Sequence, residues 1–239
     1  MIGIVVVSHS PALARAAVEL ALEMGGDDPP RIAIAAGTAG GTTGTDAVAI
    51  AAAIDELASP EGVLVVMDLG SALLSAELAL ELRSSMHPVT LSSAPFVEGL
   101  VSAVVAASAG STLADVDAES DRAIAAKRAQ LGHDAASPSA TVAAPEAAAA
   151  GFDAVLRNPS GLHARPAASF VKAVGRYDAV VEVTDLDSGR GPASGASLVS
   201  LMSLGAGAGA HVRVTASGPD AAEALVALRE LIDEGFGEI

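Results

Sequence analysis

His163 lies in a segment whose residue types are suited to carrying a phosphoryl group. The segment reads Asn-Pro-Ser-Gly-Leu-His-Ala-Arg-Pro-Ala over residues 158–167, between a predicted strand and a helix whose first turn holds Pro166. The N–H groups and positive dipole of a helix N-terminus stabilise phosphate, and the Arg165 guanidinium can pair with its oxygens. Histidine, with a reference pKa near about 6.5, is largely a neutral nucleophile at cellular pH. These residues predict either a phosphohistidine or a helix-capping histidine beside a surface arginine.

A second histidine, His9, directly follows an apolar run at the start of the chain. Ser10 is a favourable N-cap residue and Pro11 a favourable first helical residue, so a helix is expected to begin there. The apolar run Val63–Met67 ends at Asp68, and the carboxyl ends of parallel strands meet at one edge of a sheet. A carboxylate beside an imidazole fixes its tautomer. The pattern predicts a nucleophilic His9 oriented by Asp68, or a histidine that only caps or packs at that edge.

A loop rich in glycine and threonine, residues 37–46, lies between these two segments in the sequence. This loop, which lies between His9 and Asp68, follows the predicted strand Arg31–Ala36 and can offer backbone N–H and hydroxyl groups to phosphate. It is not a nucleotide P-loop, because the Gly-Lys-Ser/Thr signature is missing. The residues that we expect to stabilise phosphate or to orient His9 are Gly41 and Thr45 of this loop, with Ser10 and Ser71. A flexible turn is the simpler alternative for the loop.

The other histidines, His87, His133 and His211, are expected to be structural or exposed to solvent. His87 precedes a proline in a predicted loop, His133 lies in a predicted linker, and His211 starts a predicted strand. No pair among the five histidines shows metal-ligand spacing with nearby carboxylates. We therefore predict no metal ion and no other cofactor.

Composition narrows the classes of function. A net charge of -16, from 13 Lys+Arg against 29 Asp+Glu, argues against nucleic acid, whose binders need a basic footprint. The absence of cysteine removes disulfides and thiolate catalysis and is compatible with a reducing cytoplasm. The first apolar run stops at Ser8, and the apolar stretch at 100–114 falls short of the roughly 20 residues that a membrane span needs. We expect a cytoplasmic protein.

The predicted elements of residues 1–131 indicate an α/β domain with an open, mainly parallel sheet and flanking helices. Strands are predicted where apolar runs resemble strands covered on both faces, at Ile2–Val7, Arg31–Ala36 and Val63–Met67. Helices are predicted at Ala12–Met24, Ala47–Leu57, Ala72–Arg83 and Ser111–Leu131. This alternation implies right-handed crossovers between parallel strands.

Residues 132–150 are predicted to be a linker, because they contain two prolines, no aromatic residue and no large aliphatic residue beyond Val142. Residues 151–239 indicate a small antiparallel sheet with helices on one face. The predicted strands are Ala154–Arg157, Ala179–Thr184, Gly189–Ala193 and His211–Thr215. The predicted helices are Ala164–Gly175, Ser197–Leu204 and Asp220–Glu234.

The segment Gly161–Ala167 resembles the active site of HPr, the histidine-containing phosphocarrier of the bacterial phosphoenolpyruvate:sugar phosphotransferase system. A second matching segment, Ser194–Gly205, lies at the expected separation, and the resemblance covers roughly residues 152–239. It implies an α+β open-faced sandwich in which His163 takes phosphate from enzyme I and Arg165 steadies it. Ser197 matches a position that a regulatory kinase phosphorylates in some members. Because Ala196 stands where a lysine is common, we interpret Ser197 as a helix-start serine.

Residues 1–131 resemble the mannose-family enzyme IIA, and most closely the phosphotransferase (M) subunit of the phosphoenolpyruvate-dependent dihydroxyacetone kinase system. The matching pieces are Val7–Ser10, Ala35–Gly37, Gly44–Val48, Met67–Glu77 and Ala94–Gly99. The segment Asp68–Glu77 separates this branch from sugar-transporter relatives. The resemblance implies that phospho-His9 donates to ADP on a partner nucleotide-binding subunit, and that a further subunit uses the ATP to phosphorylate dihydroxyacetone.

Together, the two resemblances predict a phosphotransferase that relays phosphate from enzyme I through His163 to His9 and on to bound ADP. The expected partners are enzyme I and the ADP-binding and dihydroxyacetone-binding kinase subunits. One alternative is a transport component that donates to an enzyme IIB domain, and another is a regulator that binds partners according to its phosphorylation state. A linker of this length spans roughly 25 Å and allows transfer within one chain. A homodimer through the first domain would favour transfer between chains.

Overall fold

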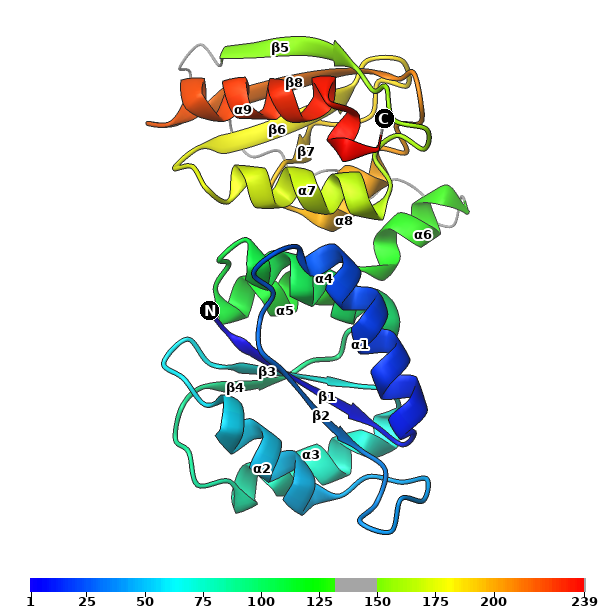
Figure 1. The fold of residues 1–239 in the computed structure, drawn as a ribbon, viewed down its shortest axis with the longest axis vertical. Helices are drawn as coiled ribbons and strands as arrows, with labels where there is room; N and C mark the ends of the chain where they lie inside the picture. Colours follow the sequence, from blue (N-terminus) through cyan, green and yellow to red (C-terminus); the bar gives the residue numbers. More distant parts are fainter. Residues whose placement is uncertain (132–149, 239) are drawn as a thin grey trace. The chain divides into compact units, whose positions relative to one another are not determined.

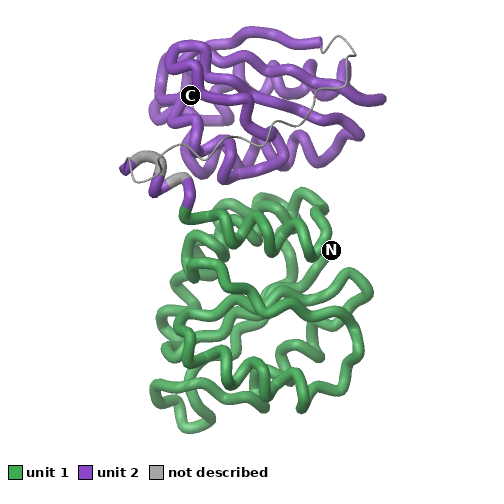
Figure 2. Tube along the Cα trace, turned by 180° about the vertical axis from the view of Figure 1, so that it is seen from behind, with its two compact units in different colours: residues 1–124 green, residues 125–239 purple. Residues whose placement is uncertain are grey.

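The computed structural model describes residues 1–131 and 150–238 of the chain. The chain divides into two compact units, Met1–Ile124 and Ala125–Ile239 (Figure 2), and each is described by itself. The predicted linker, residues 132–150, lies outside the described residues except for Ala150, which is the first residue of a strand.

The first unit is built on four parallel strands, in agreement with the predicted alternation of strands and helices. They are β1 (Gly3–Ser8), β2 (Ile32–Ala36), β3 (Val63–Met67) and β4 (Val89–Leu91), in the order β2-β1-β3-β4. The pairing of Val7 with Met67 brings the carboxyl ends of β1 and β3 side by side. His9 and Asp68 follow at this shared edge. β4 was not predicted, because its three residues are too few to show a pattern.

Helices cover both faces of this sheet (Figure 1). On one face, α1 (Pro11–Gly25), α4 (Phe96–Ser108) and α5 (Leu113–Asp121) share a core with side chains such as Ile4 and Val6. On the other face, α2 (Ala47–Leu57) and α3 (Gly70–Leu82) share a core with Val5 and Val7. Consecutive residues of β1 are therefore buried on opposite faces, which accounts for its uninterrupted apolar sequence.

Two helices of the first unit differ from the prediction. The single helix expected over Ser111–Leu131 is wrong, because α5 ends at Asp121 and α6 (Ile124–Gln130) begins after a turn. Near that break the Ser120 hydroxyl donates to the Val116 carbonyl at 2.7 Å, a local bond that favours bending. α4 was not predicted, because residues 99–107 are almost all buried and show no amphipathic period. Within the described part of the chain, no helix is long and apolar enough to cross a membrane.

The second unit has the predicted antiparallel sheet with helices on one face (Figure 1). Its strands are β5 (Ala150–Val155), β6 (Val180–Asp185), β7 (Ala193–Ser194) and β8 (His211–Ser217), in the order β5-β8-β6-β7. Buried and exposed residues alternate along β6 and β8, so one face of the sheet is covered. The helices are α7 (Ala164–Val174), α8 (Leu198–Ser203) and α9 (Ala221–Asp233), followed by the 3₁₀ turn Gly235–Gly237. Their buried side chains, among them Phe170, Leu201 and Leu228, fill the core.

Candidate phosphorylation sites

His9 stands between the end of β1 and the start of α1, as the sequence predicts. Ser10 is the N-cap of α1 and its hydroxyl accepts from the Leu13 N–H at 3.3 Å. Pro11 occupies the first helical position, where its fixed backbone angle suits the helix. The ring of His9 is therefore held at the carboxyl edge of the sheet, with 21% of its side chain exposed.

Asp68 approaches His9 from the neighbouring strand β3 and contacts both its ring and its backbone. Asp68 Oδ1 lies 2.9 Å from His9 Nδ1, and Asp68 Oδ2 accepts from the His9 backbone N–H at 2.8 Å. The Asp68 side chain is only 6% exposed. Two contacts from one carboxylate fix both the position and the rotation of the imidazole.

The hydrogen bonds to Asp68 decide its charge. Burial on its own raises the pKa of the Asp68 carboxyl, but hydrogen bonds from the His9 ring, the His9 N–H and the Ser8 hydroxyl outweigh it and lower the pKa. An ionised carboxylate only accepts hydrogen bonds, so His9 Nδ1 carries the proton. Nε2 then keeps its lone pair, and Ser71 Oγ lies 3.1 Å from it. The geometry leaves Nε2 as the nitrogen of His9 that keeps a lone pair.

Ser8 is a member of this site that the sequence analysis did not single out. Its hydroxyl donates to Asp68 Oδ2 at 2.9 Å and accepts from the Ser10 N–H at 3.0 Å. Ser8 is completely buried. The sequence does contain a signal for this role, because Ser8 ends a buried strand and directly precedes His9.

The loop over residues 37–46 contacts His9 through its backbone. Gly44 donates its N–H to the His9 carbonyl at 3.1 Å. Thr45 Oγ1 lies 2.7 Å from Ser75 Oγ, and Gly41 donates its N–H to Thr38 O at 2.8 Å. These contacts of Gly41 and Thr45 are internal to the first unit and do not test whether either residue binds phosphate. Their role toward phosphate stays a prediction.

An apolar pocket of about 490 Å³ lies beside Asp68, at the carboxyl ends of β3 and β4. Its walls include Leu73, Pro95 and Phe96, with Leu69 next to Asp68. Leu69 is a large apolar side chain, and it is 58% exposed. Exposed apolar surface of this kind suits contact with a partner protein.

His163 is the N-cap residue of α7, and no side chain caps that helix end. The approach to it depends on Gly161, whose φ is +65° and whose missing Cβ would lie 2.2 Å from Ala206 O. Only glycine fits there, which explains its place in the predicted motif. His163 is 41% exposed, so a partner can reach it. The predicted position of His163 at a helix start is confirmed.

Glu238 and Asn158 complete the surroundings of His163. Glu238 Oε1 lies 3.1 Å from His163 Nε2, and Asn158 Nδ2 donates to Glu238 Oε2 at 3.0 Å. Burial raises the pKa of Glu238, but hydrogen bonds from Asn158 and His163 and the nearby charges of His163 and Arg165 outweigh it and lower the pKa. The sequence does not predict the contact of either residue with this site. Asn158 only begins the motif, and nothing in the local sequence links Glu238 to His163.

Ser197 has the structural role that we expected. It is the N-cap of α8, and its hydroxyl accepts from the Ser200 N–H at 3.0 Å. Two further histidines, His87 and His211, lie within the described residues. His87 is exposed, and His211 begins β8 with Nδ1 3.1 Å from Asp187 Oδ1. His133 lies outside the described residues, and within 1–131 and 150–238 no three His, Cys, Asp or Glu residues are arranged to hold a metal ion.

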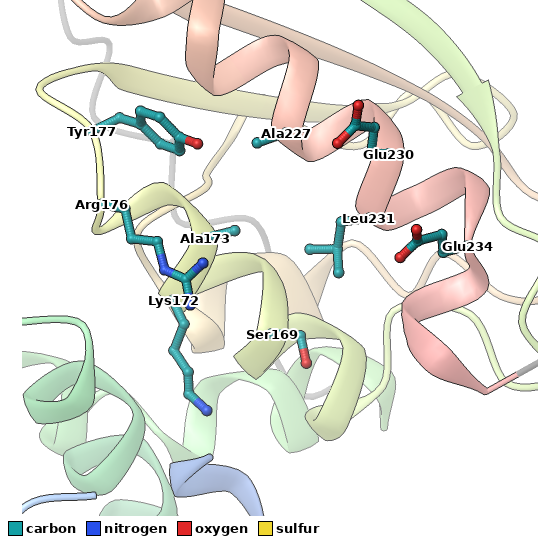
Figure 3. A pocket seen from close by; sticks show the side chains of 9 residues that line it. All are labelled: Ser169, Lys172, Ala173, Arg176, Tyr177, Ala227, Glu230, Leu231 and Glu234. Carbon is teal, nitrogen blue, oxygen red and sulfur yellow. The ribbon is translucent and has the colours of Figure 1, made fainter. Parts of the chain in front are cut away.

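A second pocket, of about 380 Å³, lies between α7 and α9 (Figure 3). Lys172 and Arg176 line it on the side of α7, and Glu230 and Glu234 on the side of α9. Neither His163 nor Glu238 is among its lining residues. The pocket is therefore separate from the surroundings of His163.

Two family models match the chain, one in each unit. Residues 3–117 match the PTS system fructose IIA component, and residues 151–234 match the PTS HPr component phosphorylation site. A parallel sheet with His9 at its carboxyl edge and an antiparallel sheet with His163 at a helix start agree with these matches. The class of protein is thus an enzyme IIA domain and an HPr domain in one chain.

Curated relatives define the family. Over 244 residues the chain is 38% identical to the phosphoryl donor subunit DhaM of the PEP-dependent dihydroxyacetone kinase of Escherichia coli (strain K12), a match that covers 100% of this chain and 51% of that protein. Over 107 residues it is 41% identical to the phosphoryl donor subunit DhaM of PEP-dependent dihydroxyacetone kinase 2 of Listeria innocua, covering 44% of this chain and 85% of that protein.

The chain belongs to the DhaM family of phosphoryl donor subunits of PEP-dependent dihydroxyacetone kinase. It spans about half the length of the Escherichia coli relative. A multiphosphoryl transfer protein of Salmonella typhimurium is 42% identical over 84 residues, which cover 35% of this chain and 22% of that protein.

Proposed function

We propose that this chain is a phosphotransferase subunit that relays a phosphoryl group from enzyme I through His163 to His9, and from His9 to ADP on a nucleotide-binding kinase subunit. A further subunit then uses the ATP to phosphorylate dihydroxyacetone. The observation that carries the proposal is the His9–Asp68 pair, in which Nδ1 lies 2.9 Å from the carboxylate and Nε2 keeps its lone pair. The family membership supports the same direction of transfer.

The chemistry at His9 follows from this pair. The Nε2 lone pair attacks the phosphorus carried by His163, the N–P bond at His163 breaks, and its electron pair stays with that ring. The proton on Nδ1 stays on the ring, where Asp68 stabilises the positive charge that develops. In the next step an oxygen of the ADP β-phosphate attacks, and the electron pair of the N–P bond returns to Nε2. Such transfers depend mainly on in-line positioning and on stabilising the phosphoryl oxygens.

The surroundings of His9 support a protein acceptor. The apolar pocket beside Asp68 and the exposed Leu69 offer a surface that a partner can cover, so that water is excluded from the phosphohistidine. The two DhaM relatives carry the words phosphoryl donor subunit in their names. We therefore propose the ADP-binding kinase subunit as the acceptor, and enzyme I as the donor to His163.

The proposal is tested by supplying phosphoenolpyruvate, enzyme I, the two kinase subunits and dihydroxyacetone to variants of this chain. Replacing His163 with alanine should abolish acid-labile phosphate on both histidines. The His9→Ala chain should be phosphorylated on His163 but yield no dihydroxyacetone phosphate. His211→Ala is the matched control, because its ring is exposed and lies 3.1 Å from Asp187, which belongs to neither site. Phosphorylated His9 in the His163→Ala chain would overturn the order of the relay.

A transport role remains the second candidate, because the first unit matches a model named for a fructose IIA component. The same assay with an enzyme IIB domain in place of the kinase subunits separates the two. Loss of phosphate to the IIB domain, with none to ADP, would replace the kinase assignment. Retention of phosphate on histidine with every acceptor would indicate a regulator instead.

Transfer within one chain and transfer between chains are distinguished by mixing variants. A His9→Ala chain can receive phosphate only at His163, and a His163→Ala chain can use only His9. If the mixture supports the full rate, transfer between chains is sufficient and a homodimer becomes the favoured arrangement. If the mixture is inactive, the relay runs within each chain.

A further inference from the structure

Ser8 is the last residue of β1, and the sheet fixes its position. Its backbone pairs with Ala36 of β2, and its carbonyl accepts from the Gly37 N–H at 3.0 Å. The side chain is completely buried, where a polar group needs a hydrogen-bond partner. A buried hydroxyl on a paired strand has little freedom to move, so it can serve as a fixed point for a neighbouring side chain.

The Ser8 hydroxyl lies within hydrogen-bond distance of three polar atoms. Asp68 Oδ2 is 2.9 Å away, the Ser10 nitrogen 3.0 Å and the Ser10 carbonyl oxygen 3.1 Å. The hydroxyl accepts from the Ser10 N–H, and its single proton can serve one of the two remaining oxygens. Hydrogen bonds to ionised groups are roughly twice as strong as neutral ones, and the carboxylate is also the nearer acceptor. The proton therefore points to Asp68.

Asp68 follows the last residue of β3, so contacts with its side chain decide where its two oxygens point. Oδ2 accepts from the Ser8 hydroxyl and from the His9 backbone N–H, which lies 2.8 Å away. This arrangement turns Oδ1 toward His9 Nδ1, at 2.9 Å. Without the Ser8 hydroxyl, one donor fewer would hold Oδ2, and the carboxylate would be freer to rotate away from the ring.

We infer that Ser8 is a positioning residue for the His9 site: its buried hydroxyl holds Asp68 Oδ2, so that Oδ1 faces the His9 ring during transfer. The inference deepens the proposed relay and rests on it. The contacts of the hydroxyl are with Asp68 and Ser10, so Ser8 acts on the imidazole through the carboxylate. A partner that orients a reactive group in this way typically contributes about 10- to 100-fold to its activity.

The same hydroxyl favours the ionised form of Asp68, because it donates to the charged carboxylate. His9 is the titratable group that faces Asp68 from β1. Asp46 of the loop 37–46 accepts instead from the Val48 N–H at the start of α2. From α3, β4 and the start of α4, the described residues that line the adjacent pocket add no titratable side chain. Removing the hydroxyl should therefore raise the pKa of Asp68 and move the acid limb of the transfer rate to higher pH.

The first experiment uses the whole chain without any phosphoryl donor. Carbon-13 NMR of the aspartate carboxyls follows the titration of Asp68, whose signal is assigned by its loss in Asp68→Asn. Ser8→Ala should raise the midpoint by about one pH unit, the size expected for a lost hydrogen bond to a charged group. Ser8→Thr keeps the hydroxyl and should titrate like the wild type. An unchanged midpoint in Ser8→Ala would overturn the inference.

The second experiment measures transfer from a phosphorylated His9→Ala chain to a His163→Ala chain. Ser8→Ala in the acceptor should lower kcat by about 10- to 100-fold and leave KM within about threefold, because a completely buried hydroxyl does not touch the donor. Ser8→Thr should recover most of the rate. Ser120→Ala is the matched control, since Ser120 is also completely buried and its hydroxyl bonds within α5. Equal losses in Ser8→Ala and Ser120→Ala would refute a positioning role.

The role of Ser8 is tested apart from the relay with phosphoramidate, a small donor that phosphorylates imidazole. The His9 ring attacks the phosphorus, the P–N bond of the donor breaks, and ammonia leaves with its electron pair. In a His163→Ala chain, Ser8→Ala should slow this reaction by about 10- to 100-fold, and a wild-type rate would contradict the inference. If phospho-His163 fails to phosphorylate His9 in chains with Ser8 intact, the proposed relay falls, while the titration and the phosphoramidate rate still decide the role of Ser8.

Discussion

Replacing Asp68 with asparagine tests the chemistry of His9 with little change of shape. Three donors converge on the two oxygens of Asp68: the His9 ring and backbone N–H at 2.9 and 2.8 Å, and the Ser8 hydroxyl at 2.9 Å. Asparagine offers a single acceptor oxygen and an amide that donates. When that amide faces Nδ1, the ring must move its proton to Nε2, and the reactive lone pair is lost.

The size of the effect follows from the contacts that change. A hydrogen bond to a charged group contributes about 1.5–3 kcal/mol, which corresponds to roughly 10- to 150-fold in rate. The wrong tautomer adds to this, and an equivalent carboxylate-to-amide change in a catalytic triad costs about 10⁴-fold. We expect Asp68→Asn to slow phosphorylation of His9 by about 10²- to 10⁴-fold.

The assay follows the transfer of phosphate from His163 to His9 in a single turnover, with the two phosphohistidines separated by peptide mapping. Asp28→Asn is the matched control, because Asp28 is exposed and follows the end of α1 that is opposite to His9. Thermal unfolding checks that the variant is folded. Transfer at the wild-type rate, with phosphate still on Nε2, would refute the argument that Asp68 sets the tautomer.

Three further predictions concern single groups. Ser71→Ala removes the hydroxyl 3.1 Å from His9 Nε2 and should slow transfer by about 3- to 10-fold without changing the unfolding temperature, which rapid-quench kinetics and calorimetry can measure. Gly161→Ala places a Cβ 2.2 Å from Ala206 O at a φ of +65° and should lower the free energy of unfolding by about 2–4 kcal/mol in urea, whereas Gly207→Ala, which meets nothing within 4 Å, should not. Because hydrogen bonds lower the pKa of Asp68 in the folded state, the wild-type chain should lose its stability advantage over Asp68→Asn as the pH falls from about 4 through the folded-state pKa. A difference that stays constant over that acid titration would contradict this account.

Most of the fold could be predicted because its elements carry local patterns. Apolar runs predict β1 and β3, and a Ser-Pro pair predicts the start of α1. Each of these elements lies within a few residues of its predicted position. The pair of His9 and Asp68 could also be predicted, since parallel strands in register bring their carboxyl ends together. By contrast, β4 is too short to show a period, and α4 is buried on nearly every side.

The site of the second unit was predicted only in its local part. Gly161, His163 and Arg165 lie in one continuous motif, but Glu238 meets His163 across 75 residues. That contact depends on the path of the chain after α9 and on the buried ring of Phe236, which no pattern in the sequence encodes.

The contact between Glu238 and His163 also limits where a tag or a fusion partner can be attached to this chain. Glu238 Oε1 lies 3.1 Å from His163 Nε2, so an affinity tag or fusion partner attached directly after Glu238 would start beside the imidazole. A bulky or strongly basic tag there would compete for the carboxylate and alter the very activity being assayed. Cleavage of the chain between α9 and Glu238 would remove this carboxylate without touching either histidine.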